Sequence, residues 1–154
     1  MDDLTLARVV HVASVVLWIG GVYFVTCVVM PAIRKSTAAA SRLSAFHALE
    51  ASFSWQARIW VALAGTSGLW MIHRGDMWSR FLDLHFWWMH AMVALWIVFA
   101  MMLFVIEPIF VHRRMMQSTT PEADFARMES AHRILLILAL ISVIGAAGGS
   151  HGLL

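Results

Sequence analysis

Eight histidines stand out in this chain of 154 residues, of which 61% are hydrophobic and only 13% are charged. Two of them, His11 and His90, lie a turn or more inside apolar runs. An ionisable side chain at that depth in a membrane is costly, and it usually faces the interior of a helix bundle with a partner. A neutral imidazole is also the commonest metal ligand in proteins. The histidines are therefore the first candidates for a ligand-binding or redox site.

Four apolar runs are long enough to position these histidines in a bilayer, because a hydrocarbon core of ~30 Å takes about 20 residues of helix. They cover residues 6–30, 55–72, 86–106 and 134–154. The chain shows no internal repeat and a single cysteine, Cys27, so no disulfide framework is expected. The sequence therefore predicts one all-α domain over residues 1–154, a four-helix transmembrane bundle with up-down-up-down topology.

Two of the helices are expected to extend beyond their apolar runs. Thr120 and Pro121 have the residue types of an N-cap and a first helical position, and acidic residues follow them. The fourth helix should therefore begin near Pro121. Pro108 is expected to kink the third helix near its end. Apolar residues before the second run recur at helical spacing and predict an amphipathic lead into it: Leu43, Phe46, Leu49 and Phe53.

The basic residues predict the orientation in the membrane. The side with both termini and the loop between the second and third runs, here called the terminal side, carries Arg8, Arg74 and Arg80. The opposite side, here called the basic side, carries eight basic residues: Arg34, Lys35, Arg42, Arg58, Arg113, Arg114, Arg127 and Arg133. The basic side should be cytoplasmic, which places both termini in the periplasm of a bacterial inner membrane protein. The net charge of +2 follows from this asymmetry and indicates no nucleic-acid partner.

Each of the four runs brings a histidine to the terminal side: His11, His73, His90 and His151. His85 lies there too, but it is five residues from His90, about 140° around a helix, so the two cannot face one point. The deeper His90 is preferred. The remaining histidines lie on the basic side among the arginines, where solvated surface positions are expected: His47, His112 and His132.

Haem b fits such an arrangement, because two neutral imidazoles from different helices can clamp a porphyrin iron in a bundle core. We expect His11 and His90 to be the axial ligands of the haem iron, with His73 and His151 as alternates or as ligands of a second haem. Glycines near these histidines favour a flat ligand, although small residues also let helices pack closely. They are Gly20, Gly21, Gly65, Gly68, Gly145, Gly148 and Gly149.

Copper is the main alternative. The chain has 11 methionines, and Met71, Met89 and Met92 lie beside His73 and His90. Thioethers and imidazoles together suit Cu(I), although methionine is also common core filler.

Three segments resemble the small four-helix membrane proteins of the CopD and HemJ-like group. In "HVASVVLWIGGVYF", His11, Trp18 and a glycine pair match the histidine, tryptophan and small residues of the first helix in that group. "WMHAMVALW" is similar to the third-helix WLHxK pattern of HemJ-like proteins, with His90 on the histidine and Met92 in place of the lysine. "GTSGLWMIH" resembles the end of the second helix. The resemblance implies haem b binding with His11 as a ligand, and the missing lysine sets the chain apart from the protoporphyrinogen oxidases.

The favoured function is a membrane redox protein, a quinone-linked oxidoreductase that passes electrons between a quinone in the bilayer and a periplasmic partner or superoxide. A copper-handling protein and a HemJ-like protoporphyrinogen oxidase stay open as alternatives. The expected partners are the lipid bilayer, a quinone or quinol, a periplasmic redox partner and, as an open alternative, a second copy of the chain.

Overall fold

The structure is a computed structural model of the chain, and it describes residues 2–111 and 118–150. These residues are helical almost throughout, and none of them forms a strand. The all-α prediction is therefore confirmed for this part of the chain. The elements, in order, are α1 (Asp3–Phe24), η1 (Val25–Val29), α2 (Met30–Ser36), η2 (Ala39–Ser41), α3 (Arg42–Arg74), η3 (Trp78–Leu82), η4 (Leu84–Phe86), α4 (Trp87–Met101), η5 (Met102–Val111) and α6 (Pro121–Ser150).

Two π-helical stretches accompany the two prolines that lie within long helices. α1 continues through η1 into α2 without a break, and the backbone N–H of Met30 bonds to the carbonyl of Val25, five residues back. Pro31 follows directly and cannot donate a hydrogen bond to the preceding turn. η5 contains Pro108 and has π-helical geometry from Met102 onward, whereas the kink expected at this proline stays a prediction.

The predicted helix starts are confirmed. α6 begins at Pro121, and the N–H of Asp124 bonds to the carbonyl of Thr120 at 3.0 Å. α3 begins at Arg42, well before its apolar run, and Leu43 and Phe46 of its amphipathic lead are buried.

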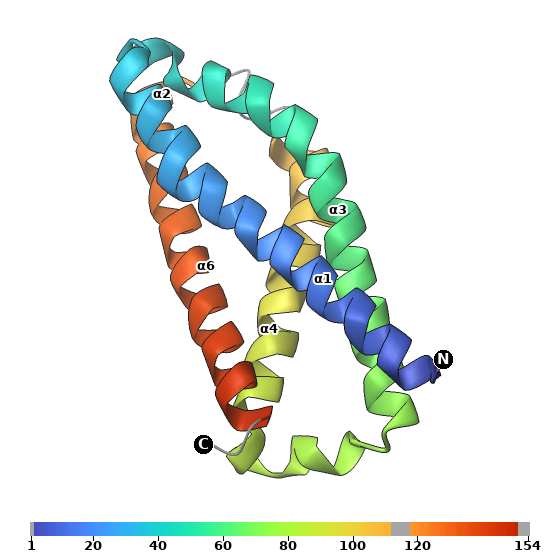
Figure 1. Ribbon diagram of the computed structural model, residues 1–154. Coiled ribbons are helices and arrows are strands. Elements are labelled where there is room, and N and C mark those ends of the chain that lie inside the picture. The colour runs from blue at the N-terminus through green and yellow to red at the C-terminus, as the bar shows by residue number, and fades with distance from the viewer. Residues whose placement is uncertain (1, 112–117, 151–154) are drawn as a thin grey trace.

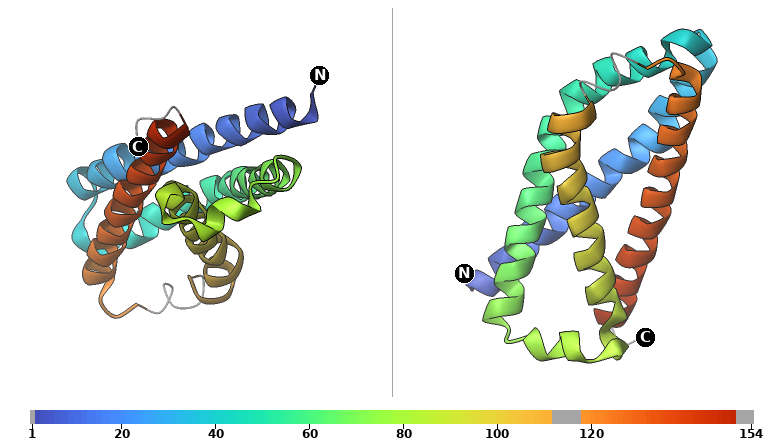
Figure 2. Two further views of the ribbon diagram at one scale, coloured as in Figure 1. Left: turned by 90° about the horizontal axis from the view of Figure 1, so that it is seen from below. Right: turned by 180° about the vertical axis from the view of Figure 1, so that it is seen from behind.

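α1 packs mainly against α3, and α4 packs against α6. Figure 1 shows α1 crossing one face of the assembly, and Figure 2 shows α4 on the opposite face, between α3 and α6. Both ends of the described chain lie at the same end of the molecule as η3 and η4, whereas α2 and the start of α6 lie at the other end (Figure 1).

Two apolar clusters hold the helices together. The larger one joins α1, α3, α4 and α6 and consists of Trp18, Ile19, Val22, Val61, Ala64, Leu95, Phe99, Leu136 and Ala139. The second lies where α2, α3 and α6 meet and consists of Met30, Ile33, Leu43, Phe46 and Phe125. Close van der Waals packing of these side chains holds the helices together, because lipid tails leave no hydrophobic driving force between helices inside a membrane.

The outer surface is apolar, as lipid contact requires. Large hydrophobic side chains such as Val16 and Ile144 are 63% and 69% exposed. Among the described residues, three helical segments are long and apolar enough to cross a membrane: Asp3–Ser36, Leu84–Pro108 and Pro121–Gly149. The chain is thus a helical membrane protein with several candidate spans. α3 is not one of the three, because Gln56, Arg58 and Thr66 lower the hydropathy of the run predicted at 55–72.

Candidate functional site

His11 lies on α1 and reaches across to the backbone of α3. Its Nδ1 is 2.8 Å from the carbonyl oxygen of Ala64 and 3.4 Å from the hydroxyl of Ser67. A Cβ atom on Gly68 would lie only 3.1 Å from the His11 ring, so the glycine admits this close approach. Because a helix carbonyl can only accept, Nδ1 carries the proton and Nε2 keeps its lone pair. No residue in the described ranges bonds to Nε2.

His90, at the start of α4, has a different environment. Its Nδ1 is 3.2 Å from the carbonyl oxygen of Phe86, and its Nε2 is 3.0 Å from that of Phe81. The Phe81 ring also contacts the imidazole edge at 5.4 Å between centroids. A neutral imidazole has one N–H and can donate to only one of these carbonyls. Ligation of a metal by His90 therefore requires the ring to give up one of the two contacts.

His73, one of the other two predicted ligands, does not lie in the interior. His73 is exposed at the end of α3, and His151 lies outside the described residues. Among described residues, His11 and His90 do not contact each other, and no three His, Cys, Asp or Glu side chains cluster as a metal site. The structure thus brings His11 to α3 and His90 to the η3–η4 connection.

Two of the three histidines predicted on the surface of the basic side, His47 and His132, are more buried than expected. His132 is half-buried, lies with its Nδ1 3.0 Å from the carbonyl of Met128 and packs edge-on against Phe46. His47 is half-buried too, with its Nδ1 3.2 Å from a carboxylate oxygen of Glu50. The solvated positions expected for these two are corrected accordingly, and His112 lies outside the described residues.

Aromatic rings of the protein itself lie on four of the glycines that suggested a flat ligand. A Cβ atom on Gly65 would lie 2.4 Å from Trp96, and one on Gly145 would lie 2.5 Å from Trp87. Gly149 and Gly21 face Trp88 and Phe53 in the same way. The small size of these glycines is explained by ring packing between helices. The eight tryptophans were the signal in the sequence that could have indicated it.

Trp18 adds an unsatisfied donor to the face of α1 that carries His11. It is 5% exposed and meets the ring of Phe99 edge-on at 4.9 Å. Its indole Nε1 is buried and has no hydrogen-bond partner among the described residues. Leaving such a group unpaired costs about 1–3 kcal/mol. His11 and Trp18 are seven residues apart and thus lie on one side of the helix, so both could serve one bound molecule.

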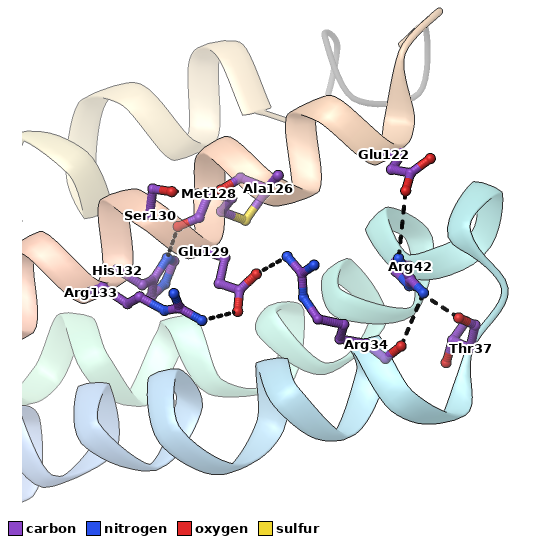
Figure 3. A network of polar contacts seen from close by, with 10 residues as sticks. All are labelled: Arg34, Thr37, Arg42, Glu122, Ala126, Met128, Glu129, Ser130, His132 and Arg133. Carbon is purple, nitrogen blue, oxygen red and sulfur yellow. Dashed lines mark hydrogen bonds and ion pairs between the residues drawn. The ribbon is translucent and has the colours of Figure 1, made fainter.

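A buried carboxylate on the basic side was missed in the sequence. Glu129 of α6 is 3% exposed and accepts hydrogen bonds from Arg34 and Arg133 (Figure 3). Arg34 comes from α2 and Arg133 from one turn further along α6. The spacing of Glu129 and Arg133 by four residues on a helix was the available signal.

A second polar cluster joins α3 to η5. Arg58 donates to the carbonyl of Leu103 at 3.0 Å and pairs with Glu107 at 3.4 Å. Glu50, the partner of His47, lies nearby on α3 with a side chain that is 25% exposed. Burial, and to a smaller extent the charge of Glu107, together raise the pKa of Glu50 to about 7.

The raised pKa of Glu50 predicts how the free energy of unfolding depends on pH. Between the ordinary pKa of 4.5 and about 7, the folded protein binds more protons at Glu50 than the unfolded chain does. The free energy of unfolding should therefore fall as pH rises through this window, by up to about 3 kcal/mol, and level off above it. Unfolding in detergent across pH 4–8 measures it, and Glu50→Gln should flatten the slope. Glu122→Gln, at a carboxylate 71% exposed, is the matched control; equal slopes in both variants would contradict the assignment.

Comparison with known proteins assigns the chain to no family. No protein-family model, no curated protein and no solved structure matches the chain, so the likeness to the CopD and HemJ-like group rests on the quoted motifs alone.

Proposed function

We propose that this chain is a haem b-binding redox protein of the bacterial inner membrane that transfers electrons between a membrane quinone and a partner on the periplasmic side. The observation that carries the proposal is His11. Its Nδ1–H is fixed on the Ala64 carbonyl at 2.8 Å, which is the arrangement that orients a metal-ligating histidine and leaves Nε2 for the metal. When bound, haem b supplies one-electron transfer.

The residues around His11 meet some of the requirements of a bound haem. His11 offers a free nitrogen, and Trp18 offers a buried N–H donor without a partner among the described residues. His90 fits after release of one carbonyl contact, and it is the second axial ligand in the proposal. In the described part of the chain, no alternative histidine is both partly buried and near the terminal side.

The proposed topology is a four-helix bundle with up-down-up-down spans, in which α3 is the additional span. Both ends of the described chain lie at one end of the molecule (Figure 1), and the sequence assigns eight of the 11 basic residues to the opposite, basic side. A C-terminal alkaline phosphatase fusion should therefore be active in cells, because the enzyme requires the periplasm, and a C-terminal fluorescent protein that folds only in the cytoplasm should stay dark. The reverse result would contradict the orientation.

The absorption spectrum of the purified protein tests the function. We expect a Soret band with sharp α and β bands after reduction, and a pyridine haemochrome of the b type. A quinol analogue should reduce the protein. Carbon monoxide should leave the reduced spectrum largely unchanged, because His11 and His90 would both hold the iron and leave no position for a further ligand. Rapid, stoichiometric binding of carbon monoxide would show an open axial position and contradict the electron-carrier proposal.

A colourless protein that contains copper by elemental analysis would favour the copper alternative.

A further inference from the structure

The ion-pair cluster around Glu129 carries an excess of positive charge. One carboxylate faces two guanidinium groups, so this cluster keeps one positive charge uncompensated. The carboxylate side chain is only 4% exposed, whereas those of Arg34 and Arg133 are 47% and 61% exposed. Each arginine therefore uses one edge to contact Glu129 and can present other N–H donors outward.

Contacts with neighbouring residues hold the two guanidinium groups in place. The Arg34 side chain lies with its Cζ 5.9 Å from the ring centroid of Phe125, and Arg133 contacts Glu129 at 2.5 Å. Arg42 fixes the end of α2, because it donates to the carbonyls of Arg34 and Thr37 at 3.0 and 3.1 Å (Figure 3). Arginines ordered in this way lose little conformational freedom on binding an oxyanion, and their planar fork matches a phosphate.

The position of the two arginines along the helices identifies the source of the phosphate. Arg133 directly precedes the apolar run 134–154, and Arg34 follows the apolar run 6–30 by four residues. This is the level at which phospholipid headgroups lie. One and two turns along α6 from Arg133, Ile137 and Ile141 are 56% and 49% exposed and can contact an acyl chain. A free phosphate ion has no apolar part that could contact this surface.

We propose that Arg34 and Arg133, held by Glu129, bind the phosphate of an anionic phospholipid in the leaflet of the basic side. Its net negative charge balances the excess charge of the cluster, whereas the cationic group of a zwitterionic lipid would be repelled. The site is independent of haem binding, and only its assignment to the cytoplasmic leaflet rests on the proposed topology.

The test measures lipid affinity of the full chain by native mass spectrometry, with phosphatidylglycerol and phosphatidylcholine as probes. The wild-type protein should retain phosphatidylglycerol in preference to phosphatidylcholine. In the triple variant Arg34→Gln, Glu129→Gln, Arg133→Gln, the buried carboxylate is neutralised together with its partners, so no buried charge is left without a partner. Its affinity for phosphatidylglycerol should fall about tenfold, with the affinity for phosphatidylcholine unchanged.

Arg127→Gln is the matched control, because Arg127 lies on the same helix, is 78% exposed and pairs one-to-one with Asp124. It should bind phosphatidylglycerol like the wild type. Equal affinity in the triple variant and the wild type would overturn the proposal, and so would an equal loss in Arg127→Gln. Displacement of phosphatidylglycerol by an excess of inorganic phosphate would show a free-anion site instead of a lipid site.

Discussion

The His11→Ala protein is expected to lose its low-spin haem spectrum, with haem occupancy at least about tenfold below that of the wild type. The physical reason is the fixed position of the imidazole, since the Ala64 carbonyl holds Nδ1 and Gly68 admits the ring against α3. No other described histidine lies on α1, so no neighbouring side chain of that helix can replace the ligand. The pyridine haemochrome per mole of protein measures the loss.

Two controls separate ligation from folding. His73→Ala removes an exposed imidazole from the terminal side and should leave occupancy and spin state unchanged. Added imidazole should restore the low-spin spectrum of His11→Ala, because a free ligand can enter the space that the side chain leaves. Full haem content with an unaltered low-spin spectrum in His11→Ala would show that the ligand lies on another helix.

The elements of this fold could be predicted because they depend on local sequence. Pro121 with its preceding threonine, and the spaced apolar residues Leu43 and Phe46, are signals that act within one helix. The second run was harder to judge. Its length suits a span, but Arg58 and other polar residues place α3 below the hydropathy of the other segments. Pairing of Arg58 with Glu107 on η5 compensates part of that cost, and this contact between helices leaves no local pattern.

That His11 would face another helix was predictable, whereas its partner was not. The imidazole meets the backbone carbonyl of Ala64, and any residue type has a carbonyl. The glycines show in the same way that a sequence signal does not identify the group it contacts. A small residue indicates only that something bulky approaches, and Trp96 on Gly65 is as flat as a porphyrin edge. Which group lies there follows from how the helices cross.

The second large effect is a loss of stability that we expect when the ion-pair cluster of Glu129 is broken. The double variant Arg34→Gln, Arg133→Gln is expected to lose about 3–5 kcal/mol of the free energy of unfolding, because it leaves a buried carboxylate without a partner. Because Glu129 is only 3% exposed, its carboxylate must either stay charged without a partner or take up a proton, and both cost free energy at neutral pH. Reversible unfolding in mixed detergent micelles measures the change.

Adding Glu129→Gln to this double variant should recover most of the lost stability, since a neutral amide has a much smaller desolvation cost than a carboxylate. Glu129→Gln alone should cost less than the double variant, because Arg34 and Arg133 are half-exposed and can turn to water or to a lipid phosphate. The predicted order is therefore wild type, then the single and triple variants, then the double variant. If the triple variant were as unstable as the double one, the loss would come from the arginine stems packed on Phe125 and the neighbouring helix, and charge burial would not be the cause.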